Sequence, residues 1–195
     1  QLTYTATYDP TTANNVYYWS DTYRLINRAN IVMEGIAEAQ ENGVITPEAA
    51  ADYIAQAKFL RALSHFELVL HFARPYHHTA DASHPGIPYR ELAFNTQENI
   101  EAGLQQGRNS VAEVYSKVLD DLNAAENGLF SKSERSGTSQ ITRATKEAAI
   151  ALKTRVYLHM RDWPNVLTEA QKITETYSLT DTPFGSFDNG YGHSE

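Results

Sequence analysis

Apolar residues recur every three or four positions along most of this chain, and that spacing places them on one face of an α-helix. The first such stretch runs from about Tyr17 to Asn42. Gly43 follows it, at the place where a helix commonly ends in a left-handed residue. Residues 1–16 are polar and are predicted to form a loop. The apolar positions of this first helix are Trp19, Tyr23, Ile26, Met33 and Ile36.

A second, longer helix is predicted from Pro47 to about Ala73. Thr46 can cap its first turn, and proline is favoured at the first helical position. Its apolar residues form two stripes, so we expect it to be covered on two sides and to lie centrally. The stripes are Tyr53, Ala57, Leu60, Ser64 and Leu68, and Phe59, Leu63, Phe66 and Leu70. Together, residues 17–73 are predicted to form the first helix pair.

The segment 75–109 is rich in proline and glycine and is predicted to be one long irregular loop. Loops of this length in compact domains are often functional. After it, Ser110 and Glu113 have the spacing of a capping box, which predicts a helix that ends near Gly128.

Two further helices are predicted from Ala144 to Met160 and from Asp162, an N-cap followed by Pro164, to Tyr177. This pair spans 34 residues, the tetratricopeptide period. Each repeat of that kind buries its apolar face only against a neighbour, so a stack is expected. The predicted fold is therefore all-α, a single region over 1–195 of tetratricopeptide-like repeats with long irregular loops. Residues 110–177 supply the further repeat helices and 178–195 an irregular tail.

Charge and composition exclude several classes of function. The 195 residues carry 24 acidic and 16 basic side chains, and the arginines are scattered, so no nucleic-acid footprint is expected. The chain contains no cysteine, which excludes disulfides and thiol catalysis. No stretch approaches the roughly 20 apolar residues of a membrane span. No catalytic motif is present either, so we expect a protein that is not an enzyme and needs no cofactor; a helical glycan hydrolase is the alternative.

Few residues suggest a binding site. Tyr4, Tyr8 and Tyr76 fall in predicted loops, where an exposed ring could stack on a sugar. The competing interpretation is that each packs over a helix end. Trp19 and Trp163 stand at helical positions or turns, and we expect both to be packed in the core.

Other polar residues have structural interpretations. His77, His78 and His84 cluster near Asp81, but their spacing matches no zinc signature, so a solvated loop is predicted and no metal site. Asp120 and Asp121 are adjacent on a helix and must point in different directions. Arg61 lies between the two apolar stripes, and we expect it to pair with a carboxylate inside the helix stack.

Five motifs, in order along the chain, resemble those of the SusD/RagB family. They are WSDTYRLINRAN at 19–30, YIAQAKFLRAL at 53–63, GIP at 86–88, NSVAEVY with the following DL at 109–122, and RATKEAAIALKTRVYL with DW at 143–163. Each motif alone is weak, but together they cover most of the chain. The positions that match the family motifs most closely are Trp19, Asn30, Arg61, Asp121, Arg155 and Trp163.

The resemblance implies a lipid-anchored nutrient-binding protein on the surface of the bacterial outer membrane. Such proteins cap a TonB-dependent, SusC-like transporter and capture oligosaccharides, or peptides in the RagB branch. The helical repeats would be the scaffold that docks the transporter, and the lipid anchor would lie outside this chain. A generic tetratricopeptide adaptor between proteins is the alternative that the 34-residue period alone allows.

Overall fold

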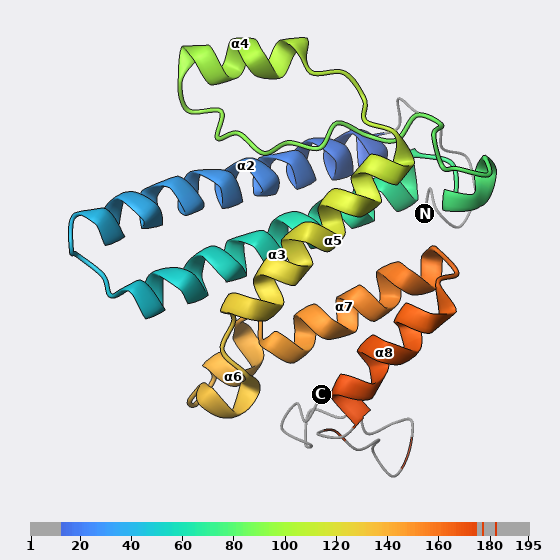
Figure 1. Ribbon diagram of the computed structural model, residues 1–195. Helices are drawn as coiled ribbons and strands as arrows, with labels where there is room; N and C mark the ends of the chain where they lie inside the picture. The colour runs from blue at the N-terminus through green and yellow to red at the C-terminus, as the bar shows by residue number, and fades with distance from the viewer. Residues whose placement is uncertain (1–12, 175–176, 178–181, 183–195) are drawn as a thin grey trace.

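The protein, as a computed structural model, is described here for residues 13–174, 177 and 182. In this part of the chain, successive long helices pack side by side in chain order (Figure 1). The long helices are α2 (Ala13–Glu41), α3 (Pro47–Phe72), α5 (Val111–Gly128), α7 (Lys146–His159) and α8 (Trp163–Thr174). The shorter ones are η1 (Tyr76–His78), α4 (Gln97–Gln105), η2 (Lys132–Glu134) and α6 (Ser139–Thr142).

The predicted all-α, tetratricopeptide-like architecture is confirmed. Helices α2 and α3 form one antiparallel pair, and α7 and α8 form another (Figure 1). Helix α5 lies between the two pairs and contacts both α3 and α7. The stack therefore buries the apolar faces of successive helices against one another, as repeat proteins do.

Local sequence signals fix the helix ends. Gly43 adopts φ +69°, and the N–H of Val44 donates to the carbonyl of Ala39 (2.9 Å), which closes the end of α2 in a Schellman arrangement. The Thr46 hydroxyl accepts from the Ala49 N–H (3.2 Å) and caps α3. These contacts confirm the predicted boundary between the first two helices.

The predicted start of α5 is also confirmed, because the capping box of Ser110 and Glu113 is present. The Glu113 N–H donates to the Ser110 hydroxyl (3.2 Å), and the Ser110 N–H donates to the Glu113 carboxylate (2.7 Å). At α8 the Asn165 N–H donates to the Asp162 carboxylate (3.3 Å), which confirms Asp162 as the N-cap.

Two predicted boundaries were wrong. Helix α2 begins at Ala13, so part of the predicted loop 1–16 is helical. The predicted loop 75–109 contains α4, which Thr96 caps by accepting from the Asn99 N–H (3.2 Å). Residues 1–12 and most of the predicted tail 178–195 lie outside the described residues.

Helix α3 is central, as its two stripes predict, but one stripe is only partly covered. Phe66 and Leu68, one from each stripe, are fully buried, and the main core extends from α3 to α5 and α7. Tyr53 and Leu60 lie in the same stripe as Leu68 but nearer the start of the helix, and they are 37% and 40% exposed. They border an apolar groove of about 350 Å³ between α2 and α3. Its α2 wall carries Leu25, Arg28, Ala29, Val32 and Ile36.

Buried charges tie the later helices to the stack. Arg135 pairs with Asp52 at 2.7 Å and donates to the carbonyl of Ala144, so the link after α5 is held against the start of α3. Lys153 of α7 pairs with Glu126 of α5 (2.6 Å) and Glu169 of α8 (2.9 Å). Among the helices described, none is long and apolar enough to cross a membrane.

The α2–α3 groove predicts binding of a hydrophobic dye such as anilinonaphthalene sulfonate, because contiguous exposed apolar surface attracts such molecules. A chain with Leu25→Gln and Leu60→Gln should lose most of the dye fluorescence and keep its thermal unfolding midpoint. Leu104→Gln is the matched control, because Leu104 is 78% exposed on α4. Unchanged fluorescence in the double variant would show that the dye reports another surface.

Candidate functional site

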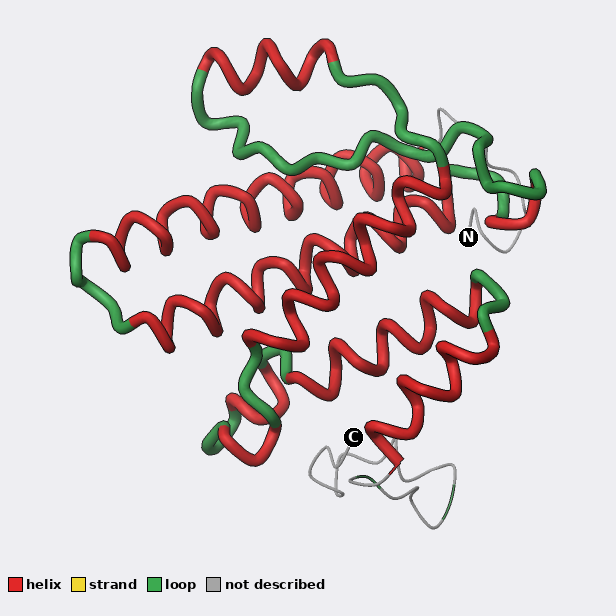
Figure 2. The backbone as a smooth tube through the Cα atoms, in the orientation of Figure 1, coloured by secondary structure: helices red, strands yellow, loops and turns green. Residues whose placement is uncertain are grey.

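The segment 84–95, here called the strap, runs in an extended path beside α2 and α3 before it enters α4 (Figure 2). The sequence predicts an irregular loop here, with a solvated loop at the histidine cluster that includes His84, but much of the strap is buried. Ile87, Tyr89 and Ala93 are at most 1% exposed, and His84 is also buried. Because backbone polar groups in such a segment need partners, the strap depends on side chains from the helices.

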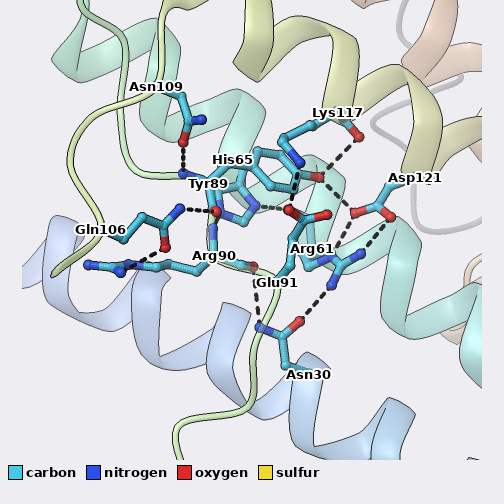
Figure 3. Close-up of polar contacts among 10 residues, drawn as sticks. All are labelled: Asn30, Arg61, His65, Tyr89, Arg90, Glu91, Gln106, Asn109, Lys117 and Asp121. Atoms are coloured by element: carbon cyan, nitrogen blue, oxygen red, sulfur yellow. Dashed lines mark hydrogen bonds and ion pairs between the residues drawn. The ribbon is translucent and has the colours of Figure 1, made fainter. Parts of the chain in front are cut away.

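The centre of this arrangement is a buried ion pair between α3 and α5 (Figure 3). The Arg61 guanidinium donates to both carboxylate oxygens of Asp121, at 2.6 and 2.7 Å. Its third nitrogen donates to the side-chain oxygen of Asn30 on α2 (2.9 Å). A bidentate pair of this kind is strong and fixes geometry. Asp121 is thus the carboxylate that the sequence analysis expects beside Arg61.

Tyr89 carries the network into the strap. Its hydroxyl donates to Asp121 (2.7 Å), and its ring stacks on the His65 imidazole with centroids 3.8 Å apart (Figure 3). Burial, the negative charge of Asp121 and the hydrogen bond to it raise the pKa of the Tyr89 hydroxyl well above its ordinary value. The hydroxyl therefore stays protonated and remains a donor.

His65 joins α3 to the strap through both ring nitrogens. Burial lowers the pKa of its imidazole to about 3, so the ring is neutral near neutral pH. Nδ1 lies 3.0 Å from the Arg61 carbonyl, and Nε2 lies 3.0 Å from the Arg90 N–H. The carbonyl can only accept and the N–H can only donate, so the tautomer with its proton on Nδ1 satisfies both.

Three side chains of α2 complete the attachment of the strap. The Tyr23 hydroxyl donates to the Pro88 carbonyl (2.7 Å). Asn27 accepts from the Phe94 N–H (2.7 Å). The Asn30 amide donates to the carbonyls of Arg90 (3.2 Å) and Leu92 (2.9 Å).

The chain that returns from α4 holds the strap from its other side. Gln106 donates to the Tyr89 carbonyl (2.7 Å), and the Asn109 side chain accepts from the Tyr89 N–H (2.9 Å). The Arg90 guanidinium donates to the Gly103 carbonyl (2.6 Å). A Cβ on Gly103 would lie 2.5 Å from the Phe94 ring, so a larger residue there would displace that ring.

Between the strap and the first turns of α2 lies an open groove of about 330 Å³. It combines aromatic rings with polar side chains, the combination found in sites for small polar ligands. Beside it, Tyr17 and Tyr18 on α2 are 62% and 39% exposed. The residues that line this aromatic groove are Trp19, Ser20, Tyr23, Asn27, Pro88, Arg90 and Phe94.

Donors in the aromatic groove remain available to a ligand. The Asn27 side-chain nitrogen has no hydrogen-bond partner among the described residues, because only its oxygen is used. The Arg90 guanidinium lies over the Phe94 ring at 5.3 Å. Its hydrogen bonds to described residues are both made by Nη1, so its other nitrogens have no such partner. A flat apolar surface flanked by fixed donors can bind the face of a sugar ring and its hydroxyls.

Of the three tyrosines named from the sequence, Tyr76 does not line the aromatic groove. Tyr4 and Tyr8 lie outside the described residues. Tyr76 is half-buried and packs edge-on against Tyr115 of α5, with centroids 4.8 Å apart. Whether any of the three contacts a ligand stays a prediction.

The tryptophans have different surroundings. Trp19 packs on Tyr23 and Phe72, with ring centroids 4.8 and 4.9 Å apart, so it contributes to the edge of the core. The expectation that Trp163 is packed in the core was wrong, because Trp163 is 56% exposed at the start of α8. Arg155 is also exposed and lies 3.5 Å from Glu67.

The remaining predicted groups lie apart. Asp120 is exposed, while its neighbour Asp121 is buried. His77 contacts the Met160 carbonyl (2.8 Å). Both ring nitrogens of His84 are used, by Thr79 (2.9 Å) and by the Arg74 carbonyl (3.2 Å).

Sequence reasoning missed the contacts between the strap and the helices. Tyr89, His65 and Asn27 were not recognised, although a signal for Tyr89 exists. In the sequence the large apolar residues Ile87 and Tyr89 alternate with Pro88 and Arg90, as in an extended segment with one buried side. His65 and Asn27 give no such signal, because a polar residue on a helix says nothing about a strap that is distant in sequence.

The sequence and the fold are similar to those of known proteins. The sequence matches a SusD-like family model, described as "Starch-binding associating with outer membrane", over residues 1–158. The chain belongs to the SusD family. A SusD-like protein of Formosa agariphila is 25% identical over 156 residues, which is 80% of this chain and 25% of that protein.

Solved structures of the SusD superfamily share the fold. A SusD superfamily protein of Bacteroides fragilis superposes with a TM-score of 0.81 at 28% identity, over 97% of this chain and 41% of that chain. A laminarin-binding SusD-like protein superposes with a TM-score of 0.68 at 21% identity, over 91% of this chain and 36% of the other. This chain thus spans less than half the length of these relatives.

The Arg61–Asp121 pair predicts a large effect on stability. Asp121→Asn leaves the buried Arg61 without a counter-charge, so the free energy of unfolding should fall by about 3 to 5 kcal/mol in urea titrations. Asp120→Asn makes the same chemical change one residue away on the exposed side of α5, and it should leave the urea midpoint unchanged. Equal stability of the two variants would contradict the central role of the ion pair.

Proposed function

We propose that this chain is the helical part of a non-catalytic glycan-binding subunit on the surface of an outer membrane. The observation that carries the proposal is the family match, whose description is one of starch binding in association with the outer membrane. A SusD-like relative of the same fold binds laminarin. Both descriptions name carbohydrate binding and neither names a reaction, which supports a non-catalytic role for this chain.

The aromatic groove gives the proposal a location on this chain. Trp19, Tyr23 and Phe94 supply rings, while Asn27 and Arg90 supply donors fixed by the strap. Rings present apolar area with little conformational entropy to lose, so they suit the shallow apolar face of a sugar. The groove is open at the surface, as a site for part of a longer oligosaccharide must be.

The same proposal gives the helix stack the role of a scaffold that docks a TonB-dependent, SusC-like transporter. The long helices are held rigidly to one another by buried ion pairs. A rigid stack presents its outer surface in a fixed shape, which suits a stable contact with a large partner. Its attachment to the membrane would use a lipid anchor outside the residues described.

Oligosaccharide binding should depend on the aromatic groove. Isothermal titration with maltooligosaccharides and laminari-oligosaccharides should show an affinity that Trp19→Ala lowers by about tenfold or more, as for a central aromatic contact. Ser20→Phe should act similarly, because it fills the groove and removes no packed ring. Tyr53→Ala is the matched control, because it removes a partly exposed ring near the start of α3 that does not line the aromatic groove.

Thermal unfolding separates loss of the site from loss of the fold. Trp19 packs against Phe72, so its replacement lowers stability to some degree, whereas Ser20→Phe should not. If Ser20→Phe folds normally and binds the sugars as the native chain does, the aromatic groove is not the glycan site.

The transporter partner is tested by affinity purification from a solubilised cell envelope. The protein should retain a TonB-dependent outer-membrane transporter. The Ser20→Phe variant should retain the transporter equally well, because docking by the helix stack does not use the aromatic groove. Recovery of cytosolic proteins alone would support a generic tetratricopeptide adaptor and contradict the proposal.

A further inference from the structure

A second hollow, of about 410 Å³, lies where the end of α3 meets the beginning of the strap. Its α3 side consists of His71, Phe72 and the following Arg74. Its other side carries His78, His84 and Arg108. We call it the basic pocket, because two arginines and three histidines line it and no carboxylate does. This concentration is notable in a chain whose net charge is −8.

The cationic groups of the basic pocket are available to a ligand. The Arg74 guanidinium is exposed and makes no hydrogen bond or ion pair with the described residues. Arg108 donates to the Gly86 carbonyl (2.6 Å) and the Pro85 carbonyl (3.1 Å). These bonds fix the Arg108 fork in place and leave one terminal nitrogen without a partner among the described residues.

The histidines form the rest of the wall. His71 donates from Nδ1 to the Glu67 carbonyl (2.8 Å), so its Nε2 is free of described partners and donates only when the ring is protonated. His78 packs edge-on against His84, with centroids 5.1 Å apart. The nearest carboxylates have other contacts. Glu67 lies 3.9 Å from His71 and also pairs with Arg155, and Asp81 accepts from the Ser83 N–H.

An arginine fork binds planar or tetrahedral oxyanions, because its N–H groups match two oxygens at once. The Arg74 fork and the remaining terminal nitrogen of Arg108, on two sides of one hollow, favour a ligand that carries a carboxylate or a sulfate. A neutral sugar can accept from these donors through its hydroxyls, but it brings no charge, and such hydrogen bonds are weaker than those to an oxyanion.

The basic pocket is also adjacent to the aromatic groove. Phe72 lines the pocket, and its ring packs edge-on against Trp19 of the groove at 4.9 Å. Tyr18 lies over the same border, with its ring centroid 5.0 Å from that of His71 and 6.2 Å from that of Phe72. A single oligosaccharide can therefore reach both sites across aromatic surface.

We propose that the basic pocket binds the carboxylate or sulfate group of an acidic carbohydrate, so that this protein selects acidic over neutral glycans. The inference rests on the proposed glycan-binding function and adds the class of glycan. The shared chemistry is an oxyanion on a sugar ring, either a uronic acid or a sulfate ester.

Isothermal titration with three oligosaccharides of matched length tests the inference. They are an oligogalacturonate, a sulfated galactan oligosaccharide and an unsulfated galactan oligosaccharide. At least one acidic ligand should bind more tightly than the neutral one. Arg74→Gln should weaken that ligand by about tenfold, the size of one charge-assisted hydrogen bond, and leave neutral binding unchanged.

Arg143→Gln is the matched control. Arg143 is exposed and lies over the Tyr53 ring near the start of α3, at the other end of that helix from the basic pocket. Arg143→Gln removes the same charge as Arg74→Gln. Equal losses of affinity for the acidic ligand in the two variants would mean that the overall charge of the protein attracts the ligand, and would overturn the inference. Added salt should weaken acidic binding more than neutral binding.

Other outcomes are also decisive. If neutral and acidic ligands bind alike and Arg74→Gln affects neither, the inference fails while the proposed glycan binding stands. If an oligoglutamate peptide binds as tightly as the acidic sugars and with the same dependence on Arg74, the pocket recognises peptides and the carbohydrate assignment fails. If no carbohydrate binds at all, the proposed function itself fails.

Discussion

The buried contact between Arg61 and Asp121 is the interaction on which the rest of the structure depends. A guanidinium and a carboxylate taken out of water cost several kcal/mol each unless nearly every donor and acceptor is satisfied. Here the remaining partners are Asn30 of α2 and Tyr89 of the strap. The ion pair therefore requires both neighbours in place, and three helices and an extended segment become fixed relative to one another.

This requirement explains why a long connecting segment is ordered. The strap has little regular secondary structure of its own, so its backbone groups need external partners. His65, Asn27 and Asn30 supply them from helices that the ion pair already holds in register. The walls of the aromatic groove and the basic pocket are thereby built from backbone that is as well supported as a helix. Binding surfaces prepared in this way lose less entropy when a ligand arrives.

The sequence correctly predicts the features that depend on interactions between residues close together in the chain. Thr46, Gly43 and the pair Ser110 and Glu113 act within one turn of their own helix, so the boundaries they mark were found correctly. Helix α4 was missed because it is short and carries only two large apolar residues, Ile100 and Leu104. The central position of α3 followed from its two stripes.

The sequence does not predict burial or ion-pair partners that depend on residues distant in the chain. Tyr53, Leu60 and Trp163 have apolar side chains at helical spacing, yet they are exposed, because burial depends on which element packs over them. Likewise, Arg61 indicates that a carboxylate is needed but does not choose among 24 acidic residues. The family resemblance correctly gave the fold, and it gave no signal for the groove or the pocket.

The attachment of the strap has a consequence for the order of folding. The pairs α2–α3 and α7–α8 join neighbours in sequence, whereas Tyr23 meets Pro88 across 65 residues and Arg61 meets Asp121 across 60. Contacts of such separation carry the larger loop-closure entropy and tend to form after local ones. The aromatic groove lies at the contact between α2 and the strap, and each of these segments forms one wall. A ligand that touches both walls therefore stabilises the contact that forms last in folding, and its binding free energy adds to the stability of that contact.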